Sequence, residues 1–535
     1  MSVNPPAGDP DLAGAAAAVD VADGVARAAA RHLAGLEGEG FDTTAYDLAH
    51  AASAVESARA VLDYGARGDL EARIACAFVA DAVHDLAARL LGREHLWGSV
   101  PGVLDPAMGF VRAFRSPAFV AALAGEPGPR HLDDDMEMVR DAFRRFAEDR
   151  IRPVAEHVHR TNGDIPEDVI AGLAELGAFG LSVPAEYDGF ATGGEGEYLA
   201  MVVATEELSR ASLGVGGSLI TRPEILTRAL VKGGTEEQKR RWLPLLASGE
   251  VMAAVAVTEP DFGSDVAGVK VTATRADGGW VVNGVKTWCT FAARAEVLML
   301  LARTDPDRTK GHRGLSLFVV PKPRGESHGF ELRQDGGGKL EGRPIDTIGY
   351  RGMHSYELAF DGWLVPDDAL VGGEAGLGRG FYLQMEGFEN GRLQTAARAV
   401  GLMQAAYEAA ADYAANRVVF GRPIAEAELT RVKLGRMAVI IQSARQLMYR
   451  VARLMAAGEG ALEASMVKAY VCRAAEWVTR EAMQIHGGMG YAEEFPVSRY
   501  FLDARVLSIF EGADEILALK VIARRLVERT SADAD

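Results

Sequence analysis

The chain has 535 residues, of which 48% are hydrophobic and 25% charged, as in ordinary globular proteins. Its net charge of −18 argues against nucleic acid as the main partner, because phosphate binding needs a basic surface. The three cysteines are far apart and lack a metal-binding spacing, which favours neither a disulfide framework nor a zinc site. With no secretory pattern at the N-terminus and no apolar run long enough to span a bilayer, the sequence predicts a cytoplasmic protein.

Residues 1–130 are predicted to form a helical extension. Apolar residues recur at helical spacing over 46–58 and again over 74–90, where Ile74, Phe78 and Val83 share one face. A Pro-Gly-Pro linker at 127–129 ends this segment. The next segment, 131–250, is again predicted to be helical, and the carboxylates of 133–135 suit the start of its first helix.

A middle β domain is predicted for residues 251–370. Short β-rich runs occupy residues 251–257, 269–274, 280–288, 297–302, 315–320 and 355–360. The pair Asn283-Gly284 stands between two apolar runs, which predicts a two-residue hairpin turn. Long amphipathic patterns return over 371–535 and predict a C-terminal helical bundle. The predicted fold class is therefore α+β, mostly α, with an additional N-terminal helical extension.

A candidate general base lies near the C-terminus. The segment Ser508–Ile516 sets Glu511 beside Gly512 in an apolar run. If Ile509 and Phe510 enclosed the carboxylate, lost hydration would raise its pKa toward the range useful to a base. Gly512 removes a side chain where an acyl group could approach. The alternative is that Glu511 starts a helix or forms an ion pair.

Five motifs, taken in order along the chain, carry a family resemblance. They are Ala256–Val266, Asn283–Thr290, Arg417–Ile424, Gln484–Tyr491 and the segment around Glu511. This ordered set resembles the acyl-CoA dehydrogenase family of flavoproteins over about residues 133–528, and the predicted helical, β and helical segments agree with that family's three-domain fold. The resemblance implies FAD as the cofactor, no metal, and at least a homodimer, commonly a homotetramer.

The resemblance assigns cofactor contacts to Val257, Thr258, Ser264, Trp288, Thr290, Arg417, Phe420, Gln484, Gly487, Gly488 and Glu515. Thr258 and Thr290 offer hydroxyls, and Trp288 offers an apolar face, to the flavin. In the family, the positions matching Arg417 and Phe420, with Gln484 and Gly488, serve the FAD of the neighbouring subunit. Each residue alone also has an ordinary structural interpretation. The threonines would favour strands, the aromatic residues would pack in the core, Arg417 would be a solvated charge, and the glycines would break a helix.

The same resemblance implies the catalytic and substrate-binding residues. Glu511 falls at the position of the family's catalytic base, and Gly391 occupies the alternative position that some members use. The implied substrate contacts are Ser264, Arg222, Glu389, Arg392 and Gly512. Glu389 and Arg392 have an equally simple role as an intrahelical ion pair, and Ser264 as a turn residue.

The implied reaction is α,β-dehydrogenation of a short, branched acyl-CoA thioester. Glu511 would remove the α-proton, the β-hydrogen would leave as hydride to flavin N5, and electron-transfer flavoprotein would accept the electrons. Two alternatives stay open from the sequence. One is another short- or branched-chain acyl-CoA dehydrogenase, or an acyl-CoA oxidase that passes electrons to oxygen. The other is a non-catalytic flavin-binding paralogue. The net charge of −18 and the retained Glu511 both argue against this second alternative.

Three segments outside the motifs narrow the resemblance. The N-terminal extension, with Thr347–Leu358 and Gln394–Gly401, is most like members that convert methylsuccinyl-CoA to mesaconyl-CoA in the ethylmalonyl-CoA pathway. Arg222 aligns with the far end of the acyl pocket, where it would pair with a distal carboxylate. The alternative is that Arg222 points away and pairs with Glu224 or a neighbouring helix. Ala513 departs from the family pattern, in which the residue after Glu-Gly usually carries a hydroxyl group.

Overall fold

The computed structural model describes residues 8–35, 40–125, 127–325 and 328–532. The chain divides into two compact units. The first joins Met1–Glu137 to Thr395–Asp535, and the second is Met138–Gln394. The predicted N-terminal extension thus belongs to the same unit as the C-terminal helices. The predicted limits of the four sequence segments stay a prediction.

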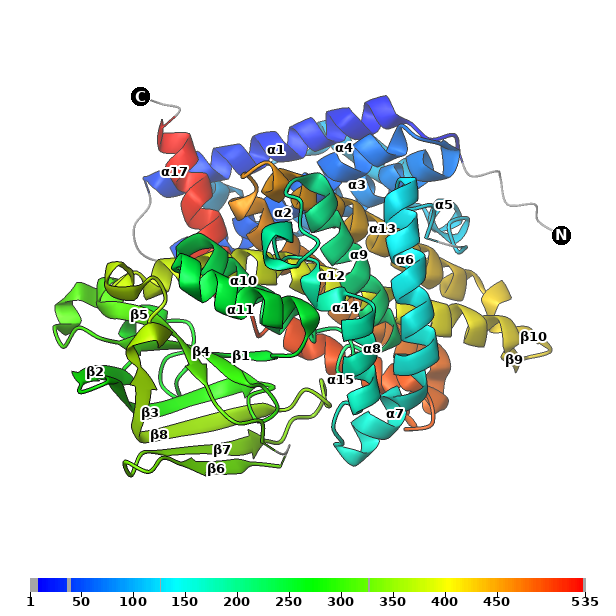
Figure 1. The fold of residues 1–535 in the computed structure, drawn as a ribbon. Coiled ribbons are helices and arrows are strands. Elements are labelled where there is room, and N and C mark those ends of the chain that lie inside the picture. The colour runs from blue at the N-terminus through cyan, green and yellow to red at the C-terminus, as the bar shows by residue number, and fades with distance from the viewer. Residues whose placement is uncertain (1–7, 36–39, 126, 326–327, 533–535) are drawn as a thin grey trace. The chain divides into compact units, whose positions relative to one another are not determined.

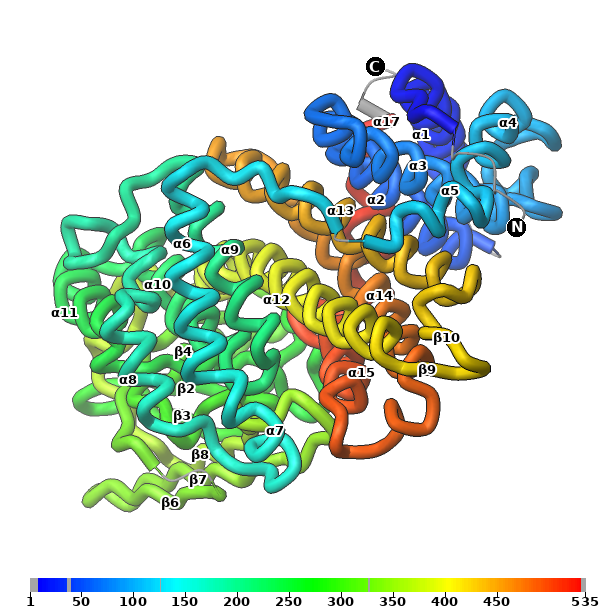
Figure 2. The backbone as a smooth tube through the Cα atoms, turned by 90° about the vertical axis from the view of Figure 1, so that its right-hand side faces the viewer, coloured from blue at the N-terminus to red at the C-terminus, as the bar shows by residue number. Residues whose placement is uncertain are grey.

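The first unit is built almost wholly from helices. Its elements are α1 (Leu12–Ala34), α2 (Phe41–Gly65), α3 (Asp69–Leu90), η1 (Glu94–Trp97), α4 (Asp105–Phe114), α5 (Pro117–Ala121), the later part of α12 (Gly380–Asn416), β9 (Val418–Val419), β10 (Arg422–Pro423), η9 (Ile424–Glu426), α13 (Glu428–Ala456), α14 (Ala461–His486), η10 (Gly487–Tyr491), α15 (Pro496–Leu507), α16 (Asp514–Ile516), η11 (Leu517–Ala523) and α17 (Arg524–Ala532). Helix α2 packs against α13, α14 and η11, and α1 packs against α17 (Figures 1 and 2).

The apolar face predicted for the extension is confirmed. Ile74, Phe78 and Val83 on α3 are all buried in one core cluster. The same cluster contains Met466 from α14 and Ile522 from η11, so residues from both ends of the sequence share a single core. The extension is therefore an integral part of this unit.

Deleting residues 1–130 is expected to make the protein aggregate. The deletion removes one side of the shared core and exposes large apolar side chains such as Met466 and Ile522, each worth about 1.5–3 kcal/mol when fully buried. Size-exclusion chromatography with light scattering measures the outcome. A monodisperse truncation with an unchanged melting temperature would contradict the shared core.

The second unit begins with helices whose starts follow the sequence signals. They are α6 (Asp134–Phe146), η2 (Ala147–Ile151), α7 (Arg152–Thr161), α8 (Glu167–Glu175), η3 (Ala178–Gly180), η4 (Ala185–Tyr187), α9 (Glu195–Ala211), α10 (Thr221–Gly233) and α11 (Glu236–Ser248), with α6 beginning just before the unit boundary. The backbone N–H of Met136 donates to Asp133 Oδ1 over 2.8 Å, which caps α6. Pro153 and Pro223 lie in the first turns of α7 and α10, where proline is tolerated.

Eight strands of the described chain form one mixed sheet in the second unit. They are β1 (Ala253–Ala256), β2 (Thr272–Ala276), β3 (Gly279–Thr290), β4 (Val297–Arg303), β5 (Leu315–Pro321), β6 (Phe330–Arg333), β7 (Lys339–Ile345) and β8 (Ser355–Pro366), with short turns η5 (Val266–Gly268), η6 (Arg308–Gly314), η7 (Asp367–Ala369) and η8 (Gly373–Gly376) between or after them. The order is β1-β4-β2-β3-β8-β7-β6, with β5 paired to β4. The predicted fold class, mostly helical with a β domain and an N-terminal helical extension, is confirmed.

Helices α10 and α11 contribute to the core on one side of the sheet. Leu226 and Leu243 from these helices share a cluster with Val255, Met299 and Leu317 from β1, β4 and β5 (Figure 1). Strand β1 runs parallel to β4, and β4 pairs antiparallel with β5. This core supports the end of β1, where the predicted cofactor residues begin.

The hairpin predicted at Asn283-Gly284 is wrong. Strand β3 continues through both residues, and its pairing with β8 shifts register between Val282 and Gly284. Gly284 takes φ 126°, and a Cβ there would lie 2.8 Å from Val271, so glycine is needed for a bulge rather than a turn. The Asn283 side chain accepts a hydrogen bond from the Gly362 amide of β8 over 2.8 Å. The reversal falls earlier, where β2 pairs back onto β3 at Ala276 and Gly279.

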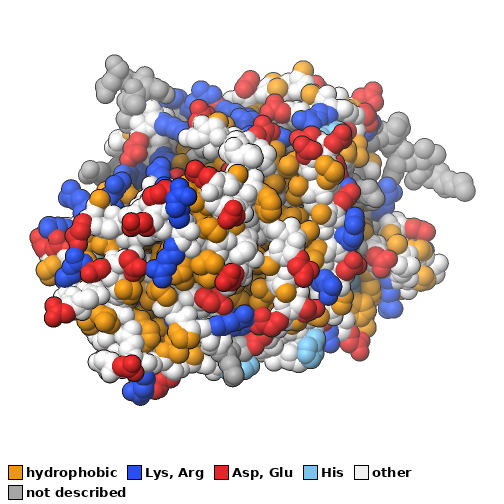
Figure 3. Space-filling view, in the orientation of Figure 1, with side chains coloured by type: hydrophobic (Ala, Val, Ile, Leu, Met, Phe, Trp, Pro, Cys, Tyr) orange, Lys and Arg blue, Asp and Glu red, His pale blue; other side chains and the backbone are white. Residues whose placement is uncertain are grey.

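The surface mixes charges of both signs. Acidic and basic side chains are interspersed over the face seen in Figure 3, so the net charge of −18 is not gathered there into one patch. Among the residues described, none of the helices combines the length and apolar character that crossing a bilayer requires.

Candidate active site

Glu511 lies on a strained turn between two helices of the first unit. Helix α15 ends at Leu507 and α16 begins at Asp514, so a six-residue connection carries the carboxylate. Glu511 itself has φ 53°, in the left-handed region that residues other than glycine rarely adopt. Such conformations cost about 1–3 kcal/mol and cluster at functional sites. Contacts with the surrounding structure, rather than the backbone preference of Glu511, therefore hold the turn in this conformation.

The surroundings of Glu511 differ on the side of Ile509 and the side of Phe510. Ile509 is 54% exposed, and its part in enclosing the carboxylate stays a prediction. The amides of Ile509 and Phe510 both donate to Val506 O, a tight turn that sends successive side chains in different directions. Phe510 instead lies beneath the buried guanidinium of Arg398, 4.9 Å from its ring centroid. The raised pKa expected for Glu511 stays a prediction.

The two residues after Glu511 shape the start of α16. Gly512 has φ 97°, a backbone conformation that favours glycine, and a Cβ there would lie only 3.0 Å from the Leu517 side chain. Both the backbone conformation and the lack of space therefore favour glycine at this position. Ala513 occupies the N-cap position of α16 and makes no side-chain hydrogen bond, as expected from its lost hydroxyl. Glu515, the last predicted cofactor residue, is exposed on α16. Space for an acyl group beside Gly512 stays a prediction.

A cavity of about 310 Å³ in the first unit collects two of the predicted cofactor residues. It is lined by Val419, Phe420, Arg422, Pro423, Ile424, Ala427, Leu429, Thr430, Lys433, Gln484 and Ile485. Strands β9 and β10 form the hairpin on one side, and the end of α14 brings Gln484. Arg417 starts this hairpin, where its carbonyl accepts from the Ile424 amide over 2.9 Å. The Arg417 side chain is exposed.

Two features of this cavity region suit a flat, phosphate-bearing ligand. Phe420 has φ 53° and a fully exposed ring, so the hairpin holds an aromatic face out from the unit. Gly487 has φ 59°, and a Cβ on Gly487 or Gly488 would meet nothing within 4 Å. A ligand can therefore approach the backbone closely at both glycines. The residues present fit the adenosine and phosphate part of FAD.

A buried ion pair organises the other predicted cofactor residues, in the second unit. Lys286 on β3 is fully buried and donates to Glu259 Oε1 over 2.8 Å and to Val257 O over 2.9 Å. The Thr287 amide donates to Thr258 O over 2.8 Å. Burial lowers the pKa of Lys286, and the Glu259 carboxylate opposes that shift. The pair therefore locks the segment after β1 against β3.

Trp288 and Thr290 follow on the same strand. Trp288 has φ 56° at a register shift of β3 and keeps 55% of its side chain exposed, so a large flat face stays available to a ligand. Its alternative role as a plain core aromatic is wrong. The Thr290 hydroxyl lies 3.1 Å from the Ser355 hydroxyl at the start of β8. Trp288 and Thr290 on β3 and Thr258 on the adjoining segment after β1 are thus brought together, and this surface suits the flavin ring.

The roles of three residues in this region could not be predicted from the sequence. Glu259 and Lys286 both stand inside quoted motifs, but nothing in their spacing indicated that they pair. Ser355 begins a predicted β run, but nothing in the sequence indicated that its hydroxyl contacts Thr290. Ser264 is exposed on the loop after Thr258, a position compatible with either of its predicted roles.

Arg222 is buried in the first turn of α10, with 7% of its surface exposed. Glu224, its alternative partner, accepts a 2.6 Å hydrogen bond from Gln394 and lies 3.5 Å from the guanidinium of Arg228. Burial raises the pKa of Glu224, and the Arg228 charge opposes that rise. Gln394 also contacts Thr205 of α9, so this residue ties α9, α10 and α12 together.

Glu389 and Arg392 lie one turn apart on the part of α12 that belongs to the second unit. Arg392 is buried and Glu389 is half-buried. Gln394 lies on the same helix and donates a hydrogen bond to Glu224, which ties α12 to α10.

Three family models match the chain. They are described as the acyl-CoA dehydrogenase N-terminal domain over residues 133–250, middle domain over 254–363 and C-terminal domain over 378–527. The (2S)-methylsuccinyl-CoA dehydrogenase of Cereibacter sphaeroides is 45% identical over 403 residues, which are 75% of this chain and 71% of that protein.

Two solved structures are similar to this chain. The glutaryl-coenzyme A dehydrogenase in complex with glutaryl-CoA has a TM-score of 0.67 and 29% identity, over 76% of this chain and 97% of that one. A glutaryl-CoA dehydrogenase from Mycobacterium smegmatis in complex with FADH2 has a TM-score of 0.65 and 25% identity, over 74% and 95% of the respective chains.

Proposed function

The chain belongs to the acyl-CoA dehydrogenase family of FAD-dependent oxidoreductases that act on acyl-CoA, and we propose that it oxidises (2S)-methylsuccinyl-CoA to mesaconyl-CoA. The observation that carries this choice of substrate is the buried Arg222. A guanidinium in that position penalises a plain alkyl chain and binds a distal carboxylate through two parallel hydrogen bonds. The similarity to a methylsuccinyl-CoA dehydrogenase and to a glutaryl-CoA dehydrogenase, both acting on dicarboxylic thioesters, supports it.

Glu511 acts as the base in this proposal. Its carboxylate takes the α-proton of the thioester, while the backbone N–H of Glu511 donates a hydrogen bond to the thioester carbonyl as negative charge develops there. The strained turn supports this role, because it presents side chain and amide from a single residue. Bound FAD supplies the acceptor for the hydride that leaves the β-carbon.

Two groups of residues hold the cofactor in this proposal. Thr258 and Thr290 hydrogen-bond the edge of the flavin ring, and Trp288 packs on its face. Arg417, Phe420, Gln484 and the backbone at Gly487 and Gly488 receive the adenosine and phosphate part of a second copy's FAD. The exposed ring of Phe420 supports a homo-oligomer, since nothing in its own unit covers it.

Replacing Phe420 by alanine is expected to lower flavin content. A ring of this size contributes about 1.5–3 kcal/mol when a ligand buries it, so cofactor affinity should fall by about 10–100-fold. The melting temperature of the flavin-free protein should not change, because the ring has no packing of its own to lose. Equilibrium dialysis followed by flavin fluorescence measures the affinity.

The control for Phe420→Ala is Phe190→Ala, which removes another exposed aromatic, 63% accessible, from the second unit. Flavin content should be unchanged in this control. A fall in flavin content after dilution to the monomer would further support a site shared between copies. Equal flavin content in Phe420→Ala and the parent, at every dilution, would contradict the shared site.

The proposed electron acceptor is electron-transfer flavoprotein, and the proposed context is the ethylmalonyl-CoA pathway. The test is to incubate the holoenzyme with (2S)-methylsuccinyl-CoA and that acceptor, and to identify the product by mass spectrometry. The expected product is lighter by two hydrogens, and the reduced protein should be reoxidised slowly by air. Rapid reoxidation by oxygen with peroxide release would identify an oxidase instead.

A further inference from the structure

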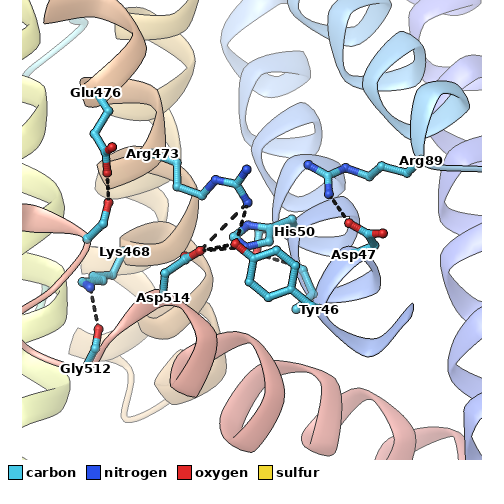
Figure 4. A network of polar contacts seen from close by, with 12 residues as sticks. Tyr46, Asp47, His50, Arg89, Lys468, Arg473, Glu476, Gly512 and Asp514 are labelled. Carbon is cyan, nitrogen blue, oxygen red and sulfur yellow. Dashed lines mark hydrogen bonds and ion pairs between the residues drawn. The ribbon is translucent and has the colours of Figure 1, made fainter. Parts of the chain in front are cut away.

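The turn that carries Glu511 is anchored on two sides within the first unit. On one side, helix α14 supplies Lys468, whose Nζ donates to Gly512 O over 2.6 Å, and Glu476, which accepts from the Ser508 hydroxyl. At the far end of the turn the Asp514 amide donates to Ser508 O over 3.1 Å and closes it. Figure 4 shows the contact of Lys468 with Gly512 and the position of Glu476, together with the contacts on the opposite side of Asp514.

The opposite side is supplied by helix α2 of the N-terminal extension. The Tyr46 hydroxyl donates to Asp514 Oδ2 over 2.6 Å, and His50 Nε2 lies 3.2 Å from the same oxygen, although 464 residues separate His50 from Asp514 in sequence (Figure 4). The two rings stack edge to face, 4.6 Å apart. Because a carboxylate only accepts, Nε2 is the donor in this contact.

The charge state of this cluster suits a fixed anchor. Burial raises the pKa of Asp514, but its hydrogen bonds from His50 and Tyr46 outweigh that effect, so the pKa lies below its usual value. Burial lowers the pKa of His50, and burial with the Asp514 contact raises that of Tyr46 to about 12. At neutral pH a carboxylate thus accepts from two neutral donors. Arg473 adds a cation 3.9 Å from Asp514 and donates to the Tyr46 hydroxyl.

On α2 His50 is buried and Tyr46 is half-buried, and the polar groups of both lie against Asp514. Burying a polar group costs free energy unless it is hydrogen-bonded, so the two residues tie the helix to one position of Asp514. Asp514 follows Glu511 by three residues, and the backbone between them is held at φ 53° and φ 97° in its first two positions. An unanchored turn would relax from these values.

We propose that Tyr46 and His50 of the N-terminal extension are positioning residues for catalysis, which act through Asp514 to hold the Glu511 turn in its reactive conformation. The proposal rests on the role of Glu511 as the base. It gives the extension a part in the reaction besides its part in the core. A base displaced by about 1 Å loses up to about a hundredfold in rate, while substrate binding, made by other residues, is retained.

Tyr46→Phe tests the proposal because it removes one hydroxyl and keeps the ring. In stopped-flow measurements on the anaerobic holoenzyme with (2S)-methylsuccinyl-CoA, the limiting rate of flavin reduction should fall by about 10–100-fold. Flavin content and the substrate's dissociation constant should change by less than about twofold. Tyr46→Phe combined with Asp514→Asn should be no slower than Asp514→Asn alone, because the two groups act through one contact.

A second pair of variants guards against a folding defect. His50→Leu should slow flavin reduction, and His50→Gln, which keeps an N–H donor, should restore most of the rate. The matched control is Tyr64→Phe, which removes a hydroxyl from a buried tyrosine on the same helix, 18 residues or about 27 Å further along, and should leave the rate unchanged.

The outcomes separate this proposal from the proposed function. Lowered melting temperatures with unchanged reduction rates in both Tyr46→Phe and His50→Leu would overturn the positioning role and leave the base assignment intact. A Glu511→Gln variant that still reduced its flavin would overturn the base assignment itself. Equal losses in His50→Leu and His50→Gln would also count against positioning through a hydrogen bond.

Discussion

Replacing Glu511 by glutamine is expected to leave FAD bound and to lower turnover by about a thousandfold or more. Glutamine keeps the shape and the hydrogen-bonding capacity of the side chain but has no useful proton affinity. Because the turn is anchored through backbone groups and through Asp514, the substitution should leave the loop in place. Anaerobic flavin reduction by substrate, followed by absorbance, measures the effect.

The matched control is Glu494→Gln, which removes an exposed carboxylate from the connection between α14 and α15 and should not change the rate. A Glu511→Gln enzyme that kept more than about a tenth of the activity, a loss of only ~1.4 kcal/mol of barrier, would show that another group removes the α-proton.

Replacing Arg222 by alanine is expected to change substrate preference rather than activity in general. For (2S)-methylsuccinyl-CoA, kcat/KM should fall by about 2–4 kcal/mol, or about 30–1000-fold, because the distal carboxylate would be buried without its partner. For butyryl-CoA, which has no such carboxylate, kcat/KM should fall far less or rise. Steady-state kinetics with both substrates measure the difference.

The control for Arg222→Ala is Arg240→Ala on helix α11, whose guanidinium is 71% exposed in an i,i+4 surface pair. Arg240→Ala should change kcat/KM for neither substrate by more than about twofold, since exposed ion pairs contribute little to stability. Equal losses on both substrates in Arg222→Ala would remove Arg222 from the acyl pocket. The choice of methylsuccinyl-CoA would then depend on similarity alone.

The order of helical and β segments could be predicted because each depends on local patterns. The buried face of α3 and the start of α6 at the carboxylates of 133–135 both followed from neighbouring residues. The sequence did not reveal two strands of the large sheet, β6 and β7. They carry charged residues such as Lys339, which pairs with Glu331 on the neighbouring strand and with Glu341 on its own strand. Strands with so many charged residues lack the apolar alternation that identifies a strand.

The hairpin at Asn283-Gly284 shows the limit of a local signal. That pair favours a two-residue turn by its backbone preferences, yet the sheet uses the same freedom for a bulge. Whether the pair forms a turn or a bulge depends on β8, whose Gly362 amide donates a hydrogen bond to the Asn283 side chain. Tertiary pairing therefore overrides the local preference.

The candidate site was predictable only where residues lie close in sequence. The motif containing Glu511 and Gly512 was recognisable, and so was the threonine and tryptophan pattern of β3. The partners that hold them were not, since His50 reaches Asp514 across 464 residues and Lys286 meets Glu259 across 27. Such pairs form only when helices and strands pack together, and residue spacing along the chain does not predict that packing.

The most direct measurement is the anaerobic bleaching of the bound flavin by a panel of acyl-CoA thioesters. The panel should contain butyryl-, isobutyryl-, glutaryl- and (2S)-methylsuccinyl-CoA, each mixed with the holoenzyme in a stopped-flow instrument. The account predicts complete and rapid bleaching by (2S)-methylsuccinyl-CoA, at a rate at least about tenfold above the rates with the other three. Faster bleaching by butyryl- or isobutyryl-CoA, with methylsuccinyl-CoA inert, would contradict it.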